Sequence, residues 1–293
     1  MDQPGAAKVR VVNRVEDKVR LGPDAQVDDK AIIIMPNDPR RTDPFLALAE
    51  DWFSEPGFEW HPHRGIETVT TVLDGVLEHG DNLGNAGALQ PGDVQWMTAG
   101  RGIIHRELAF KNEFAHTLQL WVNLPARKKM VNTNYQDLRA AGRPTVEAPG
   151  ARIEVISGAV AGITGLATNQ HPIHGSIVTL EPGAVVDVDI PAAHRVFVYV
   201  LEGRVKASGT TATEGQVAWL DPSKDGATTL RLDSLQRDEM ARVMIFSGTP
   251  LREPVVLGGP FVMNSRTEIE AAYRDFHAGK FGAVPHTARL KRT

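Results

Sequence analysis

One strand-and-turn pattern occurs twice in this chain. Thr71–Gly75 reads Thr-Val-Leu-Asp-Gly, and 128 residues later Tyr199–Gly203 reads Tyr-Val-Leu-Glu-Gly. Gly92–Trp96 reads Gly-Asp-Val-Gln-Trp, and 123 residues later Gly215–Trp219 reads Gly-Gln-Val-Ala-Trp. The two offsets differ because the first copy has a loop about five residues longer. A repeated unit of this size favours two similar domains in tandem.

Both copies have the residue pattern of β-structure. Short runs rich in β-branched and apolar residues are separated by turn residues such as Gly80–Asn85. The clearest of these runs are Thr68–Leu73, Thr117–Val122, Ser176–Leu180, Val196–Leu201 and Arg242–Phe246. One helix is predicted, at about residues 266–278, because Ser265-Arg-Thr-Glu268 is a capping box before an amphipathic run. The sequence therefore predicts an all-β protein of two barrels, followed by a C-terminal helix.

A Gly-, Pro- and Ala-rich stretch at residues 140–150 separates the two copies. We expect an N-terminal barrel within residues 1–140. Residues 150–293 are expected to form a C-terminal barrel together with the helix.

Composition excludes several classes of protein. The chain has no cysteine, which excludes disulfides, iron–sulfur ligation and thiol catalysis. The net charge of −4 gives no electrostatic footprint for nucleic acid, and the basic end at residues 289–293 is interpreted as a solvated terminus. No signal peptide or apolar run long enough to span a membrane is visible. We expect a cytoplasmic monomer that binds neither nucleic acid nor membranes directly.

Two pairs of side chains point to a metal centre. His61 and His63 flank a proline, and 42 residues after His63 the chain reads His105-Arg-Glu107. Side chains two residues apart on a strand share a face, so each pair presents both members to one side. Two such strands in contact bring three imidazoles and one carboxylate together. This set suits Fe(II), Mn(II), Ni(II), Cu(II) or Zn(II).

The repeat supplies an internal comparison for these four residues. When the two offsets are added to the numbers of the four residues, the corresponding positions in the second copy are Asp189, Pro191, Thr228 and Leu230. These four side chains would not form a metal site. The second copy keeps the apolar and turn pattern but lacks the imidazoles. The four residues are therefore interpreted as a functional addition to the first copy, and no metal is expected in the second.

The segments that contain these residues resemble the pirin family, a two-domain branch of the cupin superfamily. The similar stretches are Asp43–Phe45, His61–Thr70, Gly92–Glu107, Leu118–Pro125 and Gly259–Asn264. The resemblance covers nearly the whole chain and is densest between residues 43 and 125. It implies two stacked barrels, one mononuclear Fe(II)-type site in the first, and a C-terminal helix that packs back across the molecule. Ni, Mn, Cu, Co or Zn are the alternative metals.

The pirin pattern takes its carboxylate ligand from Glu107, where other cupins use a residue at the position of Glu67. Glu67 is then left to a structural role or to a hydrogen bond with a ligand imidazole. Four residues of strand from His63 span about 13 Å, too far for both to bind one ion without a bend.

Two functions follow from the resemblance. Some pirins resemble quercetin 2,3-dioxygenases, which implies opening of a flavonol ring with O₂ and Glu107 as both ligand and general base. Others are described as transcriptional co-regulators, which implies a metal- or redox-sensing protein that acts through a protein partner without turnover. An isomerase or another small-molecule cupin enzyme is a third reading. No GxGxxG, Walker, GxSxG or HExxH motif is present.

Other polar and aromatic residues receive weaker assignments. Gln119 and Trp121 alternate with apolar residues on one predicted strand, so Trp121 either packs in the barrel wall or lines a substrate cavity. His79 and His116 have no partner at a ligand-like spacing and are assigned no role.

Overall fold

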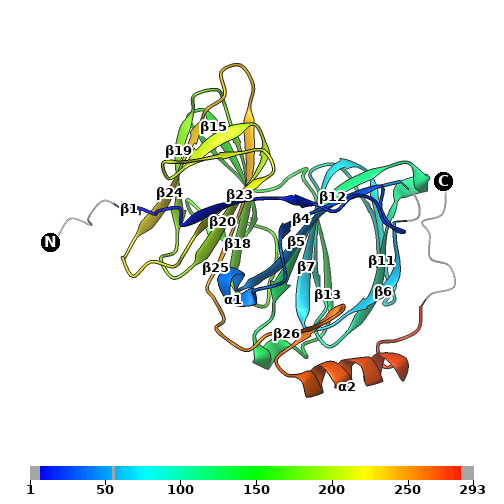
Figure 1. Cartoon of the computed structure of the whole chain (residues 1–293). Coiled ribbons are helices and arrows are strands. Elements are labelled where there is room, and N and C mark those ends of the chain that lie inside the picture. The colour runs from blue at the N-terminus through cyan, green and yellow to red at the C-terminus, as the bar shows by residue number, and fades with distance from the viewer. Residues whose placement is uncertain (1–6, 55–56, 285–293) are drawn as a thin grey trace. The chain divides into compact units, whose positions relative to one another are not determined.

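The computed structural model describes residues 7–54 and 57–284, and it consists mainly of β-strands. The basic terminus predicted at residues 289–293 lies outside the described residues. Contacts divide the chain into two compact units. Of the described residues, 19–54, 57–141 and 251–284 form the first barrel with its helix, and 7–18 and 142–250 form the second. Figure 1 shows each as curved antiparallel sheets, so the predicted all-β fold of two barrels with a C-terminal helix is confirmed.

The first barrel has two sheets that together enclose its interior. In spatial order, the larger sheet contains β13 (Asn134–Leu138), β10 (Val94–Thr98), β7 (Ile66–Gly75), β12 (Ala115–Asn123), β5 (Phe45–Phe53), β4 (Asp29–Ile34) and β3 (Val19–Arg20). The smaller sheet contains β6 (Phe58–His63), β11 (Ile103–Ala109), β8 (Leu77–Asp81) and β9 (Ala86–Leu89). Short helical turns are α1 (Pro39–Thr42), η1 (Phe110–Asn112) and η2 (Ala126–Lys128).

The second barrel has the same two-sheet plan. Its larger sheet contains β14 (Thr145–Ala148), β15 (Ala151–Ser157), β18 (Ile173–Leu180), β25 (Ala241–Gly248), β20 (Arg195–Glu202), β23 (Gln216–Leu220) and β2 (Arg14–Asp17). Its smaller sheet contains β1 (Lys8–Val9), β24 (Thr228–Ser234), β21 (Arg204–Ala207) and β22 (Thr210–Thr213), with β19 (Val185–Ile190) also paired to β24. A separate hairpin is formed by β16 (Ala159–Val160) and β17 (Ile163–Thr164).

Strand register confirms the duplication. In the first barrel Thr71 of β7 lies opposite Val94 of β10. In the second barrel Tyr199 of β20 lies opposite Val217 of β23. The two sequence offsets carry the first pair onto the second pair, so the repeated segments adopt the same pairing in both barrels.

The two interiors differ in chemistry. The second barrel is filled by one cluster of aliphatic side chains, among them Val188, Val198, Leu220 and Leu232. In the first barrel the apolar side chains form smaller clusters. Buried polar residues lie on its strands, including Glu67, Thr70, Gln95, His105 and Glu107. Burying polar groups costs free energy unless they find partners, so their concentration makes this interior the candidate functional site.

Each end of the chain belongs to the other barrel from the one that the expected ranges 1–140 and 150–293 assign to it. β2 pairs with β23, so residues 7–18 belong to the second barrel. The helix α2 (Arg266–His277) contacts the hairpin of β26 (Val256–Gly258) and β27 (Phe261–Met263), so the C-terminal segment belongs to the first barrel. Figure 1 shows α2 in red beside β26. Pairing and apolar packing between distant segments account for both differences.

The predicted helix is confirmed, together with its capping box. Ser265 is the N-cap and accepts a hydrogen bond from the backbone N–H of Glu268. The buried face of α2 places Ile269 and Ala272 against Phe261 and Phe281. Within the described residues, no helix combines the length and apolarity that a membrane crossing needs.

Candidate metal centre

Strands β6 and β11 of the first barrel place the predicted ligands. The strands are antiparallel, with His61 directly opposite His105 and His63 opposite Ile103. The ligand nitrogens of the three histidines all lie within 4.8 Å of one another. The expectation that i, i+2 pairs on neighbouring strands converge therefore agrees with the geometry of the three imidazoles.

The imidazoles of His61 and His63 are oriented by backbone carbonyls. His61 Nδ1 donates to the carbonyl oxygen of Glu59 at 2.7 Å. His63 Nδ1 donates to the carbonyl oxygen of Pro260 at 3.2 Å. Because a carbonyl can only accept, each Nδ1 carries the proton, and each Nε2 keeps a free lone pair. The Nε2 of His63 is buried and has no hydrogen-bond partner among the described residues.

His105 is oriented by His79, a histidine whose spacing in the sequence predicted no role. His79 lies on β8, which pairs with β11, and its Nε2 is 2.8 Å from His105 Nδ1. His105 Nε2 is buried without a hydrogen-bond partner among the described residues. If His105 binds a metal through Nε2, its Nδ1–H donates to His79, and His79 fixes the ring in that tautomer. No spacing in the sequence pairs these two residues, because the contact depends on strand order.

Burial keeps these histidines neutral. Desolvation, followed by repulsion between the imidazoles, lowers the pKa of His63 to about 3 and that of His105 well below its ordinary value. The neutral imidazole is the form that binds a metal. Buried, neutral Nε2 atoms that converge without partners are the donors a divalent transition metal needs, so the residues fit such an ion.

Glu107 lies beside this cluster and is bonded through both carboxylate oxygens. Thr70 Oγ1 donates to Oε1 at 2.9 Å, and Gln119 Nε2 donates to Oε2 at 2.6 Å. Desolvation outweighs these two hydrogen bonds and raises the pKa of Glu107 to about 7. A carboxylate oxygen of Glu107 and ring nitrogens of His105 and His79 all lie within 4.8 Å of one another. The four predicted ligands thus occur in two overlapping sets that share His105.

A β-bulge accounts for the position of Glu107. Between His105 and Glu107 the pairing with β6 shifts, so that Glu107 lies opposite Phe58. Glu67 lies elsewhere in the barrel, on β7, where Thr98 Oγ1 donates to its Oε1 at 2.7 Å.

A cavity of about 460 Å³ opens beside these residues. His61, His63 and Glu107 line one part of it. Its apolar lining includes Ile32, Ala47, Phe53, Phe58, Trp121 and Leu257. A largely apolar cavity with a few converging polar groups is typical of a small-molecule site.

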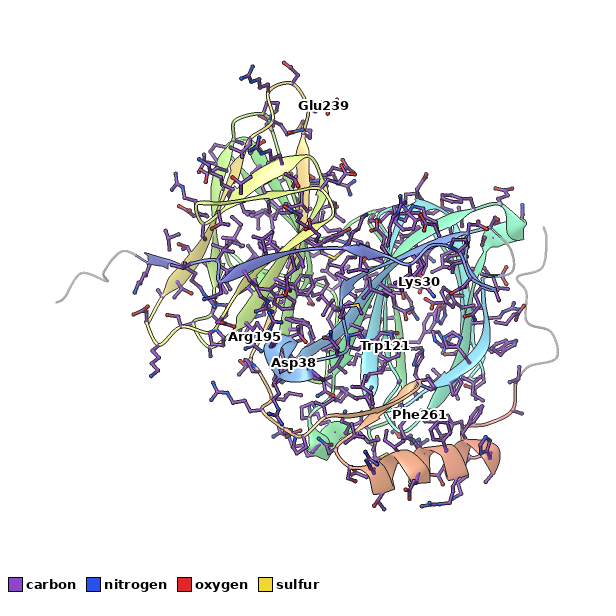
Figure 2. The ribbon with its side chains drawn as sticks, in the orientation of Figure 1. Lys30, Asp38, Trp121, Arg195, Glu239 and Phe261 are labelled. Atoms are coloured by element: carbon purple, nitrogen blue, oxygen red, sulfur yellow. The ribbon has the colours of Figure 1, made fainter. Side chains whose placement is uncertain are left out.

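Gln119 and Trp121 both line this cavity, which decides the question the sequence left open. Trp121 Nε1 donates to Gln119 Oε1 at 3.0 Å, and its ring meets that of His63 edge-on at 5.2 Å between centroids. Gln119 in turn donates to Glu107. On this face of β12, Gln119 thus orients the Glu107 carboxylate, and Trp121 covers the His63 imidazole. Figure 2 labels Trp121 within the barrel.

The corresponding strands of the second barrel carry no such cluster. There β19 pairs with β24, as β6 pairs with β11 in the first barrel. Val188, Ile190, Leu230 and Leu232 from these strands join the aliphatic core.

Comparisons with known proteins agree with this architecture. Residues 21–122 match the family model described as Pirin, and residues 177–282 match the Pirin C-terminal cupin domain. Pirin-like protein 2 of Arabidopsis thaliana is 38% identical over 279 residues, which cover 93% of this chain and 85% of that protein. The chain belongs to the pirin family. The resemblance found in the sequence is confirmed, and both barrels are cupin domains.

Two solved structures of similar proteins are informative. The quercetin 2,3-dioxygenase of Acinetobacter baumannii is 31% identical, with a TM-score of 0.83 over 94% of this chain and 100% of its own. The bacterial pirin YhhW of Escherichia coli, solved in complex with nickel(II), is 22% identical. Its TM-score is 0.64 over 81% of this chain and 99% of its own, which shows a common fold.

Proposed function

We propose that the first barrel of this pirin is a metal-dependent dioxygenase that opens the ring of flavonol-like aromatic compounds with O₂. The metal, for which we propose Fe(II), would be held by His61, His63, His105 and Glu107. One observation carries the proposal: the buried Nε2 atoms of His63 and His105 have no hydrogen-bond partner in the described part of the chain and belong to a cluster beside an apolar cavity. The similarity to a protein named quercetin 2,3-dioxygenase supports the substrate class.

Each group near the cavity has a role in this chemistry. When bound, a divalent transition metal supplies a Lewis acid with coordination positions open to small ligands. The Glu107 carboxylate lines the cavity beside the imidazole cluster, so it is placed to act as a general base that removes the proton of a substrate hydroxyl. Thr70 and Gln119 hold its carboxylate in place. The apolar walls and Trp121 suit a flat aromatic molecule and exclude water.

Metal content tests the ligand assignment. We expect about one divalent transition metal per chain, most of which is lost in His63→Ala. A content near two, or retention by the double variant His61→Ala/His105→Ala, would contradict the assignment.

Oxygen uptake tests the activity. The protein is loaded anaerobically with Fe(II) and then given O₂ with a panel of flavonols. Consumption of O₂ that depends on both metal and flavonol supports a dioxygenase. If no flavonol or catechol-like compound causes uptake, the metal- or redox-sensing regulatory function becomes the better explanation. A protein partner, the cytoplasmic location and the monomeric state remain predictions.

A further inference from the structure

An acidic side chain lies in the cavity wall formed by β4, β5 and β12. Asp51 of β5 is only 4% exposed and lines the cavity. In the sheet register it lies opposite Lys30 of β4 on one side and Thr117 of β12 on the other, and both of these also line the cavity. Figure 2 labels Lys30 on this barrel. A carboxylate therefore faces a largely apolar cavity from strands that are distinct from β6 and β11.

Asp51 has no hydrogen-bond donor at its Oδ1 within the described part of the chain, and its one ion pair is long. Its Oδ1 is buried without a hydrogen bond, and Lys30 Nζ stays 4.0 Å away. Lys30 is held instead by Asp24, whose Oδ2 lies 2.9 Å from Nζ. Desolvation raises the pKa of Asp51 to about 7. Buried polar groups almost always have a hydrogen-bond partner, so one that faces a cavity points to a partner supplied by a ligand.

The register of β12 relates Asp51 to the metal centre. Trp121, Gln119 and Thr117 share one face of β12 and follow one another at about 7 Å intervals. Trp121 meets His63, Gln119 donates to Glu107, and Thr117 lies opposite Asp51. The β12 residue opposite Asp51, Thr117, is therefore two residues, or about 7 Å, from Gln119, which donates to Glu107.

We propose that Asp51, supported by Lys30, determines specificity by accepting a hydrogen bond from a phenolic hydroxyl at the end of the ligand remote from the metal. This inference rests on the proposed function and narrows its substrate class. The preferred ligands are flat aromatic compounds that carry one chelating oxygen pair and a separate hydroxylated ring. Above about pH 7, where Asp51 is ionised, compounds with a carboxylate at the remote end are disfavoured because they would meet its charge.

Binding to the metal-loaded protein tests this site without requiring turnover. The Ni(II)-loaded protein is titrated anaerobically with 3-hydroxyflavone and with its 3′,4′-dihydroxy derivative. We expect wild type to bind the dihydroxy compound about tenfold or more tightly, the scale of one hydrogen bond to a charged group. Asp51→Ala should remove this preference, so that the two compounds bind with similar affinities.

Two further variants control for folding and for charge. Asp51→Leu fills the position with an apolar group of similar size, and it should also lose the preference at an equal or higher melting temperature. Asp29→Ala removes a carboxylate beside Lys30 that pairs with Arg20 and does not line the cavity. It should keep the wild-type preference.

The binding results distinguish failure of the Asp51 proposal from failure of the proposed flavonol function. If wild type binds both flavonols equally, or if Asp51→Ala weakens both alike, the Asp51 proposal is overturned while flavonol binding stands. A lower melting temperature for Asp51→Leu would also overturn it, because the carboxylate would then have a structural role. If metal-loaded wild type binds neither compound, both the flavonol function and this site are rejected.

Discussion

At the scale of single residues, Glu107 is the acidic member of the proposed ligand set, and both its oxygens accept hydrogen bonds from neutral side chains. Glu107→Gln keeps one oxygen donor but removes the base and its negative charge. We expect oxygen uptake with a flavonol to fall about 100-fold or more, the scale of general base catalysis, with weaker retention of the metal.

The matched control is Glu67→Gln, which changes another buried carboxylate that accepts a hydrogen bond from Thr98. Oxygen uptake and metal content are measured for both variants. If Glu107→Gln turns over at the wild-type rate with its metal in place, another group must accept the substrate proton.

His79 is predicted to act through His105 and not on the substrate. Loss of the residue that orients a metal-binding histidine typically weakens metal binding by about 10- to 100-fold. We expect this loss in His79→Leu and a partial recovery in His79→Gln, whose side-chain oxygen can still accept from His105 Nδ1–H. Competition with a chelator measures the affinity, and His116→Leu serves as control because His116 packs against Trp52 and Glu50. Equal affinities in all three variants would remove His79 from the site.

At the scale of elements, a buried lysine joins three segments around the candidate metal centre. Lys129 Nζ donates to Gly65 O at 2.9 Å, Asn123 Oδ1 at 2.6 Å and Val262 O at 2.9 Å. The segment that includes Val262 also includes Pro260, the carbonyl partner of His63. Lys129 therefore helps to hold the C-terminal hairpin against the turn that follows β6.

Lys129→Met should destabilise the protein because it leaves three buried oxygen acceptors without donors. At about 1 kcal/mol for each, the free energy of unfolding should fall by about 3 kcal/mol. Chemical denaturation measures this change, and Arg127→Met on the exposed surface of the same turn should leave it nearly unchanged. If Lys129→Met is as stable as wild type, the three contacts do not hold the hairpin.

The elements show which features the sequence could predict. The helix after Ser265 was predictable because its capping box is local. The pairing of β2 with β23 was not, because Arg14–Asp17 is short and polar and its strand partner lies about 200 residues away. The histidine pair on β6 was visible as an i, i+2 pattern, whereas His79 reaches the site only through the pairing of β8 with β11. Local periodicity predicts faces of strands, and non-local pairing decides which faces meet.

At the scale of the whole molecule, duplication has left one barrel with an aliphatic interior and the other with buried polar side chains between smaller apolar clusters. The repeat offsets predicted this contrast, since they place Thr228 and Leu230 where the first copy has His105 and Glu107. An aliphatic core contributes stability directly through burial of apolar surface. The first barrel instead keeps neutral imidazoles in its interior, which makes its stability depend on pH.

The metal-free protein should therefore lose stability in acid. Burial lowers the pKa of His63 and of His79 to about 3, below the value of about 6.5 for histidine in the unfolded chain. Between pH 6.5 and 3 the unfolded state binds protons at these imidazoles that the folded state does not, so their contribution to stability is full above about pH 6.5 and falls as the pH decreases. Asp51 and Glu107, whose pKa burial raises to about 7, contribute in the opposite direction, but the histidines with a lowered pKa outnumber them. The slope is at most about 1.4 kcal/mol per pH unit for each imidazole.

Thermal unfolding in the presence of a chelator, at pH 7 and at pH 5, measures this effect. The melting temperature of wild type should be lower at pH 5, and a His63→Leu/His79→Leu variant should show a smaller difference between the two pH values. Added metal should raise the melting temperature more at pH 7 than at pH 5, because protons compete with the metal for the imidazoles. If the His63→Leu/His79→Leu variant showed the same difference between the two pH values as wild type, these imidazoles would be protonated as readily in the folded chain as in the unfolded one.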